Sequence, residues 1–327
     1  MAISKIDPAG LDIGQIGGRR NLIINGAMQV AQRGTASSST GYQTVDRWRL
    51  NLGTQQEQKT DAPDQFKNSM EVTGTVAGSS GYGILLQRIE SNNIYAALGQ
   101  SCTLSCYVKN TGTSTANVSV EVYRANTTDN FGAITLVSSL TSQAITTGWT
   151  RITFPAFTVP TTASTGLEVR IFRYDASNDQ EWLITGVQLE VGSVATPFEH
   201  RSYGEELALC QRYFQKIGRD GASTGAIIGM IRNTHFTSAF SFPVTMRSGP
   251  TGVAYGANST TGNFGVFFGA GADTSHTANS SDVKVEYLST HGGRFRVLST
   301  SGTNGQGGYC DVGTGTNEIG MTFDAEL

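Results

Sequence analysis

The side chains that most often carry catalysis or hold metal ions are few in this chain, and none follows a known catalytic spacing. The four histidines are His200, His235, His276 and His291. No two of them have the H-x-H or H-x-x-x-H spacing of a metal site. The chain also lacks a G-x-S-x-G nucleophile elbow, a P-loop and a Gly-rich dinucleotide fingerprint after a strand. We therefore predict that the protein is not an enzyme.

A pair of carboxylates is the arrangement that would contradict this prediction. Hydrolysis of a glycosidic bond uses two carboxyl groups about 5 to 9.5 Å apart. Glu205 and Glu206 are adjacent at a predicted helix start, so their side chains point in different directions and serve the helix dipole. Strands can bring distant carboxylates together, which keeps a glycoside hydrolase open as an alternative.

The cysteines are too sparse for a disulfide framework. They are Cys102, Cys106, Cys210 and Cys310. Cys102 and Cys106 would lie on one face of a strand, roughly 13 Å apart at about 3.3 Å per residue. That distance is too long for a disulfide or a shared zinc ion. We expect four free, buried thiols in a protein made in a reducing cytoplasm.

Oxygen-bearing side chains gather in one predicted loop, DASNDQE, where they could hold calcium. They are Asp175, Asn178, Asp179 and Glu181. Their spacing differs from the D-x-[DN]-x-[DN]-G pattern of an EF-hand, and a solvated acidic turn explains them equally well. We expect no cofactor, with a structural calcium ion as the alternative.

Composition and charge favour many short strands and exclude several classes of protein. Of 327 residues, 40 are glycine and 15% are charged, which suits strands joined by tight turns. The net charge of -3, without clustered Lys and Arg, argues against nucleic-acid binding. No apolar run reaches the roughly 20 residues of a membrane helix. The N-terminus also lacks the apolar core of a secretory signal.

We predict an all-β chain in four parts. Residues 1–18 form an N-terminal arm, residues 19–200 a jelly-roll β-sandwich, residues 201–217 a linking amphipathic helix, and residues 218–327 a C-terminal β-sandwich or knob domain. The arm contains large apolar residues that a solvated tail would not need: Ile3, Ile6, Leu11, Ile13 and Ile16. We expect them to dock on a partner, and a frayed terminus is the alternative.

Alternating apolar and polar residues predict the strands. In the first β domain they are 22–28, 48–52, 103–109, 117–123, 150–159 and 167–174. In the second they are 223–231, 236–244, 264–268, 283–288, 295–299 and 319–324. The glycine- and threonine-rich runs 269–281 and 301–308 are predicted as exposed loops.

One short helix is predicted between the two β domains. Ser202 or Gly204 can cap its start, and Leu207, Cys210 and Phe214 recur at helical spacing as an apolar stripe. A helix of about three turns is marginal in water without a packing surface. That surface is either the chain's own sheets or the same helix of two neighbours around a threefold axis. We favour the second, and therefore a homotrimer.

Two stretches of this sequence resemble a known family. Residues 182–201 follow the pattern W-x-x-x-G-x-Q-L-E-x-G-x-x-A-T-x-F-E-x-R and lead into E-E-L-x-L-C-Q-R-Y-F. Residues 21–34, NLIINGAMQVAQRG, precede the triplet Asp46-Arg47-Trp48. Both resemble bacteriophage tail-fibre and related virion proteins, in which they belong to a carbohydrate-binding-module-like jelly roll. The later order F-P-V-x-M-R-x-x-P-T, closing on D-A-E-L, resembles the C-terminal knob domains of phage fibres.

The resemblance implies a structural virion protein of the phage tail, made in the host cytoplasm. The N-terminal arm would join it to the tail or to an adaptor protein, and the rest would bind a host cell-surface polysaccharide. It implies no nucleic-acid partner and no membrane insertion. Two alternatives are a virion-associated polysaccharide depolymerase and a capsid or tail decoration protein without receptor binding.

Glycan-binding residues are expected in two places, because sugars stack on aromatic rings and hydrogen-bond to short polar side chains. If the arm docks on the particle, the loops of residues 256–315 lie farthest from it. Their polar candidates are Asn258, Asn263, Asp273, His276, Asn279, Asn304 and Gln306, and their flat apolar candidates are Phe264, Phe267, Phe268 and Tyr309.

The second place is the predicted sandwich. Tyr82 and Tyr174 sit at loop edges and are its stacking candidates. Trp48, Trp149 and Trp182 have the right side chains but lie at strand starts, so we expect them in the core.

Overall fold

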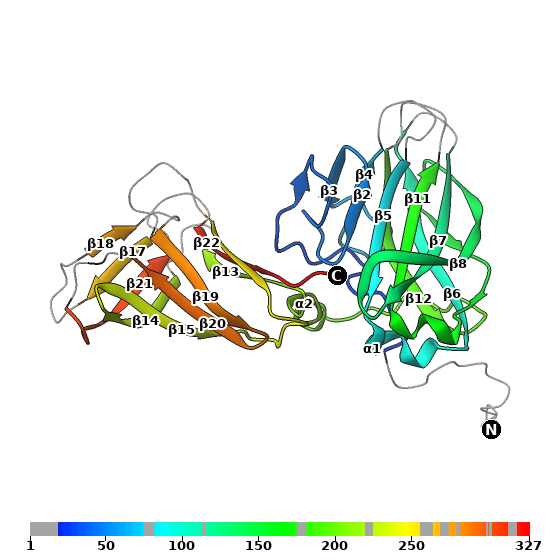
Figure 1. The fold of residues 1–327 in the computed structure, drawn as a ribbon. Coiled ribbons are helices and arrows are strands. Elements are labelled where there is room, and N and C mark those ends of the chain that lie inside the picture. The colour runs from blue at the N-terminus through cyan, green and yellow to red at the C-terminus, as the bar shows by residue number, and fades with distance from the viewer. Residues whose placement is uncertain are drawn as a thin grey trace, which may run out of the picture. The chain divides into compact units, whose positions relative to one another are not determined.

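The computed structural model describes residues 19–74, 82–112, 116–174, 181–219, 225–255, 264–268, 275–278, 282–298, 300, 303–312 and 319–327. The chain divides into two compact units, of which unit 1 runs to Leu207 and includes Leu327, and unit 2 is Ala208–Glu326. Both units consist of antiparallel strands (Figure 1), which confirms the predicted all-β class. Among the described residues, no helix has the length and apolar character of a membrane-spanning segment.

Unit 1 contains two antiparallel sheets. The strands are β1 (Ala36–Ser37), β2 (Arg49–Leu52), β3 (Gln55–Lys59), β4 (Ser69–Thr73), β5 (Tyr82–Ile89), β6 (Ser101–Asn110), β7 (Ala116–Thr127), β8 (Asn130–Ile145), β9 (Thr150–Thr153), β10 (Phe157–Thr158), β11 (Leu167–Tyr174) and β12 (Glu181–Val191). One sheet has the order β1-β3-β4-β12-β6-β10, with β9 also paired to β6, and the other has the order β2-β5-β11-β7-β8. A one-turn helix, α1 (Ser91–Ile94), follows β5.

The connectivity of unit 1 is that of a jelly roll. In the first sheet β4, β12, β6 and β9 are neighbours, and in the second β5, β11, β7 and β8 are neighbours. Numbered along the chain as one to eight, these strands occur in the orders 1-8-3-6 and 2-7-4-5, which is the double Greek key of a jelly roll. Unit 1 therefore contains the predicted jelly-roll β-sandwich.

The core of unit 1 follows the alternation of side chains along these strands. Cys102, Leu104, Cys106 and Val108 of β6 are fully buried, as are the alternate valines of β7. All four cysteines are free and buried, as predicted. Burial raises the pKa of the Cys102 and Cys106 thiols to about 12.

Two of the three tryptophan predictions are confirmed. Trp48 and Trp182 are fully buried. Trp149 is only half-buried, and its indole N–H donates to Asp61 Oδ1 at 2.9 Å on the surface of unit 1. Trp149 stays at the surface because its polar N–H finds its partner in this exposed carboxylate, so its placement in the core was wrong.

The segment 22–28 is not a strand, contrary to its sequence pattern. Asn25 has a left-handed φ of 56°. Its side chain makes the hydrogen bonds to the backbone that a neighbouring strand would otherwise make. Its Oδ1 accepts from the amides of Gln29 and Val30, and its Nδ2 donates to the carbonyls of Val30 and Asp46. The predicted strand 150–159 is also divided, into β9 and β10, on either side of Pro155.

The residues that resemble tail-fibre proteins hold the ends of unit 1 together. Glu190 accepts from the amide and the hydroxyl of Thr196 at 2.8 and 2.6 Å. Gln188 accepts from the amide of Glu199 at 2.8 Å, and the Glu199 carboxylate accepts from the amide of Asn21 at 2.8 Å. The two matching stretches are therefore partners in one network.

Arg201 and Glu206 form the buried centre of this network. Arg201 donates to the carbonyls of Ile23, at 3.0 Å, and of Asn21, and to Glu206 Oε1 at 3.3 Å. Glu206 Oε1 also accepts from the amide of Asn25 at 2.5 Å. The Arg201 and Glu206 side chains are only 4% and 5% exposed. We refer to these contacts as the terminal latch.

The linking helix is shorter than predicted. Helix α2 (Tyr203–Gln211) has Ser202 as its N-cap, since Ser202 Oγ accepts from the Glu205 amide at 3.3 Å. The chain then turns into a strand that begins at Phe214, so Phe214 is not on the helix. Leu207 is half-buried, whereas Cys210 and Phe214 are buried within one chain. The predicted helical stripe was wrong, because residues 214–219 pair with the C-terminal strand instead of continuing the helix.

Unit 2 also contains two antiparallel sheets. The strands are β13 (Phe214–Arg219), β14 (Gly225–Arg232), β15 (His235–Ser241), β16 (Thr251–Tyr255), β17 (Phe264–Phe268), β18 (Ser275–Ala278), β19 (Val283–Ser289), β20 (Gly292–Val297), β21 (Gly307–Val312) and β22 (Ile319–Asp324). Their orders are β13-β22-β16 and β18-β17-β21-β14-β15-β20-β19. The core includes Phe236, Phe295 and Phe323, all fully buried. The loop predictions were wrong at residues 275–278, which form β18, and at residues 307–308, which begin β21, because both strands pair with β17.

Candidate functional site

Most of the predicted glycan-binding side chains lie outside the described residues. This holds for Asn258, Asn263, Asp273 and Asn279. His276, Tyr309 and the phenylalanines of β17 lie on described strands, but their side chains are outside the description. Asn304 and Gln306 are described and hold turns: Asn304 accepts from the amide of Asn233, in the turn between β14 and β15, and Gln306 accepts from the Thr303 amide in its own turn.

The fold brings Tyr82 and Tyr174 together. They are Cα partners at the ends of β5 and β11, although their side chains are not described. The two stacking candidates of the sandwich therefore lie at the same edge of one sheet. Of the calcium candidates, Asp175, Asn178 and Asp179 lie outside the described residues, and Glu181 is exposed at the start of β12. The described side chains contain no cluster of three or more His, Cys, Asp or Glu that could hold a metal ion.

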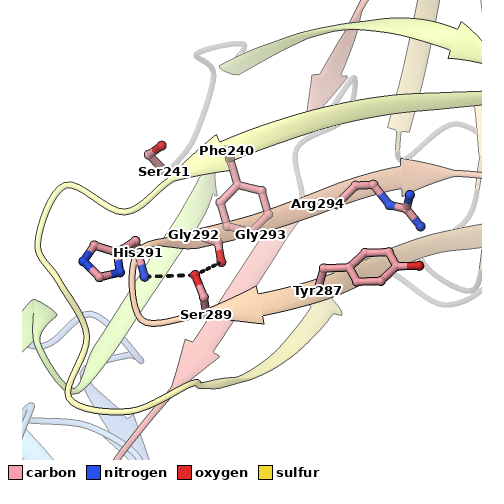
Figure 2. Close-up of a pocket in the computed structure, with 8 residues that line it drawn as sticks. All are labelled: Phe240, Ser241, Tyr287, Ser289, His291, Gly292, Gly293 and Arg294. Carbon is pink, nitrogen blue, oxygen red and sulfur yellow. Dashed lines mark hydrogen bonds between the residues drawn. The ribbon is translucent and has the colours of Figure 1, made fainter.

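A pocket of about 390 Å³ lies in unit 2, where β15, β19 and β20 run side by side (Figure 2). It is lined by Phe240, Ser241, Tyr287, Ser289, His291, Gly292, Gly293 and Arg294. The lining offers two aromatic rings, two serine hydroxyl groups and a phenol, an imidazole and a guanidinium. We refer to it as the hairpin pocket, because the β19–β20 hairpin supplies most of its residues.

A β-bulge in β19 exposes the Tyr287 ring beside the pocket. The β19–β20 register shifts between Glu286 and Ser289, so Tyr287 and Leu288 together face one residue, Gly293. Leu288 turns inward and packs against the core of unit 2. Tyr287 turns outward, is 77% exposed and has a left-handed φ of 52°. This conformation is an outlier for a bulky residue and costs on the order of 1 to 2 kcal/mol.

Arg294 holds the exposed ring in place. Its guanidinium carbon lies 4.3 Å from the centroid of the Tyr287 ring, in a cation–π contact. Figure 2 shows these two side chains lying beside each other at one end of the pocket. Arg294 also donates to Glu286 Oε2, through Nε at 3.0 Å and through Nη2. These hydrogen bonds to Glu286 raise the pKa of Arg294, which keeps it cationic.

Glycines keep the middle of the pocket free of side chains. A Cβ on Gly292 would lie 2.1 Å from the carbonyl oxygen of Phe240, and a Cβ on Gly293 would lie 2.7 Å from Leu288 Cδ2. Neither position has room for a larger residue. At the turn, the His291 amide donates to Ser289 Oγ, which donates to the Gly292 carbonyl, both at 3.2 Å (Figure 2). The hairpin is therefore held in one shape.

The arrangement suits binding better than reaction. Arg294 covers one face of the Tyr287 ring, so the other face can stack on a flat apolar surface of a ligand. The hydroxyl, imidazole and guanidinium groups of the lining can hydrogen-bond to the polar groups of the same ligand. Sequence reasoning missed Tyr287, because alternation from Val283 and Val285 places it in the core. The available signal was the Thr-His-Gly-Gly turn that follows it, which marks a hairpin.

Unit 1 carries a similar ring and guanidinium pair. Arg170 lies over the Tyr123 ring at 4.5 Å and donates to Glu168 at 2.6 Å. Elsewhere on unit 1, Asp61 accepts from Lys109 at 2.6 Å and from Trp149. The hydrogen bonds from Lys109 and then Trp149 lower the pKa of Asp61. Neither cluster lines the hairpin pocket.

Comparisons with known proteins identify no family. No family model matches the chain, and no curated protein matches it. Among solved structures, the chain is similar to the CBM22-1 xylan-binding domain of Paenibacillus barcinonensis Xyn10C, at 14% identity over 49% of this chain and 94% of that one, with a TM-score of 0.34. The tandem CBM22-1–CBM22-2 domain of the same protein matches at 12% identity over 94% of this chain and 99% of that one, with a TM-score of 0.37.

A third similar structure is the C-terminal family 22 carbohydrate-binding module of Clostridium thermocellum Xyn10B. It matches at 16% identity over 50% of this chain and 98% of that one, with a TM-score of 0.35. At these TM-scores the likeness carries no argument about function, which depends on the residues of this chain.

Proposed function

We propose that this protein is a non-enzymatic component of a phage tail fibre that binds host cell-surface polysaccharide, and that the hairpin pocket is its binding site. The tail-fibre part rests on the resemblance of residues 19–217. The binding part is supported most directly by Tyr287, whose ring is exposed next to a pocket of about 390 Å³. The pocket also lies within residues 240–294, which overlap the stretch 256–315 that the sequence favours for recognition.

The strain at Tyr287 is the feature that packing does not explain. Leu288 satisfies the core at the bulge, so the fold does not require an aromatic residue at position 287. Glycine would adopt the same backbone without strain. A strained, exposed aromatic residue beside polar groups is typical of a binding site. Stacking on a sugar ring would use the face that Arg294 leaves open.

The remaining parts of the proposal concern assembly and location. The protein would act on the virion tail as a homotrimer, with residues 1–18 docking on the tail or an adaptor protein. Those residues, including Ile3, Ile6, Leu11, Ile13 and Ile16, lie outside the described residues. Attachment and trimer formation stay predictions that rest on the sequence.

Removal of the Tyr287 ring tests the site. We expect Tyr287→Ala to weaken binding to a polysaccharide found on an array of bacterial surface glycans by about tenfold or more, since loss of one stacking contact removes on the order of 1 to 2 kcal/mol. Tyr95→Ala is the matched control, because Tyr95 is 78% exposed and lies in unit 1. Tyr287→Gly removes the ring and relieves the backbone strain, so a loss of binding together with an unchanged melting temperature in this variant would assign the loss to the ring.

Three outcomes would contradict parts of the proposal. Unchanged binding by Tyr287→Ala and Tyr287→Gly would exclude the hairpin pocket. A fall in the chain length of the bound polysaccharide, followed by size-exclusion chromatography, would identify a depolymerase. Absence of binding to every glycan on the array would favour a decoration protein.

A further inference from the structure

The strands that line the hairpin pocket carry more positive than negative charge. Strands β19 and β20 contain three cationic side chains, Lys284, Arg294 and Arg296, against one carboxylate, Glu286. Asp282 precedes β19 and is the next carboxylate along the chain. The whole chain has a net charge of -3, so this excess is local and does not reflect the overall composition.

The register places these charges on one face of the sheet. Glu286 pairs with Arg294, and Lys284 pairs with Arg296. The residues between them, including Val283, Phe295 and Val297, are buried in the core of unit 2. Because side chains alternate along a strand, the charged residues share the opposite face. Like charges in direct register, such as Lys284 and Arg296, are unfavourable in a sheet unless something else balances them.

Glu286 balances only part of this charge. Its Oε1 accepts from Arg296 Nη2 at 2.6 Å, and its Oε2 accepts from both Nε and Nη2 of Arg294. One carboxylate therefore serves two guanidinium groups. The side chains are 25 to 30% exposed, so an approaching ligand can reach them. Arg294 also lines the pocket and touches the Tyr287 ring.

We propose that the hairpin pocket is specific for acidic polysaccharides, whose carboxylate or phosphate substituents pair with the cationic face around Arg294 while a sugar ring stacks on Tyr287. This inference rests on the proposed function. A guanidinium matches carboxylate and phosphate geometry with two parallel hydrogen bonds, and such charge-assisted bonds are about twice as strong as neutral ones. The anion would supply the negative charge that Glu286 alone does not.

The experiment measures binding of the full-length protein to bacterial surface polysaccharides sorted into neutral, carboxylate-bearing and phosphate-bearing members. We expect acidic members to bind at least about tenfold more tightly than neutral ones. We also expect their binding to weaken between about 0.05 and 0.5 M salt, because exposed charges are screened. A comparison of the affinities for carboxylate-bearing and phosphate-bearing polysaccharides shows which of the two anions the pocket binds.

Two variants connect the selectivity to this face. Arg294→Gln removes the guanidinium and should reduce acidic-glycan binding by about tenfold. Lys284→Glu leaves every residue that lines the pocket unchanged, and it should weaken acidic-glycan binding severalfold and flatten its salt dependence. Arg170→Gln is the matched control, because Arg170 makes the same kind of ring and carboxylate contacts in unit 1.

The outcomes separate the inference from the proposed function. Tight binding of neutral glycans that needs Tyr287 but not Arg294 would overturn the acidic specificity and leave the proposed function intact. Sensitivity to Arg170→Gln without sensitivity to Arg294→Gln would move recognition to unit 1 and overturn the inference. Absence of binding to all members would overturn both.

Discussion

At the scale of single residues, the left-handed backbone of Tyr287 is the detail that most directly indicates function. The β-bulge converts a position that alternation assigns to the core into one that is 77% exposed. Leu288 takes the core position and fills the space over Gly293. The Tyr287 ring is therefore accessible to a ligand, and its contact with Arg294 fixes its orientation.

The buried cysteines of β6 give a prediction at the same scale. Burial raises the pKa of Cys102 and Cys106 from 9.0 to about 12. We therefore expect neither thiol to react with iodoacetamide at about pH 8 in the folded protein, because the thiolate is the reactive form. Both should react in urea, as measured by mass spectrometry of the peptides. Labelling of the native protein at the rate of an exposed cysteine would contradict the burial.

The same pKa shifts determine a pH dependence of stability. Well below pH 9.0 both thiols are protonated in the folded and unfolded states alike. Between pH 9.0 and about 12 the unfolded chain loses protons that the folded chain retains. Stability therefore falls as the pH rises through this window.

At the scale of elements, the terminal latch gives a structural role to the pattern of residues 182–201. Gln188, Glu190 and Arg201 do not line the hairpin pocket, and their partners are groups of unit 1 itself. Gly186, another member of the pattern, has a φ of 60°, and a Cβ there would lie 2.7 Å from the Phe66 ring. These residues thus close the jelly roll of unit 1, and they lie outside the hairpin pocket.

Substitutions of the adjacent residues Glu205 and Glu206 of α2 test whether the terminal latch stabilises the fold. We expect Glu206→Ala to lower the free energy of unfolding by about 2 kcal/mol, because it removes one of the two carboxylates that pair with the buried Arg201 and leaves the Asn25 amide without its acceptor, while Glu199 stays 3.3 Å from Arg201. Glu205→Ala is the control, since Glu205 pairs with Arg19 on the surface, where the side chains are 42% and 51% exposed. Its effect should be about 0.5 kcal/mol or less. Equal effects of the two variants in urea unfolding would show that the latch does not stabilise the fold.

At the scale of the whole molecule, the chain joins a jelly roll to a second β unit through one short helix. Of the residues predicted for the trimer interface on α2, Cys210 is buried and Leu207 is half-buried, and the large exposed side chain of this helix is Tyr203, at 56%. Exposed apolar residues also occur on β14, where Ile228 is 81% and Met230 is 55% exposed. Residues two apart lie on one face of a strand, so these two form a continuous apolar surface.

The predicted homotrimer is tested by its mass in solution. We expect multi-angle light scattering of the full-length protein at micromolar concentration to give about three times 34.7 kDa. Association would remove apolar side chains such as Ile228 from water, which is favourable by about 25 cal/mol per Å². Ile228→Ser should shift the protein towards lower mass if β14 is part of the interface. A wild-type mass of one chain would exclude the trimer.

The sequence by itself determined the features that depend on local pattern. Alternation identified β11, β17 and β22 to the residue, and glycine content with low charge predicted an all-β chain. Residue type and position predicted Ser202 or Gly204 as the helix cap, and Ser202 is the cap in the structure. These features follow from backbone preferences within a few residues, so no long-range contact can change them easily.

Only the tertiary structure decided the features that depend on strand pairing. Residues 214–217 were predicted as the end of the helix but pair with β22, and residues 22–28 have a strand pattern but are held by the side chain of Asn25. Tyr287 became exposed because the bulge opposite Gly293 exchanged its place with that of Leu288. The hairpin pocket exists because β15 and β20, which are far apart in sequence, pair side by side. Pairing of distant segments sets which face each side chain occupies, and a register shift of one residue reverses that face.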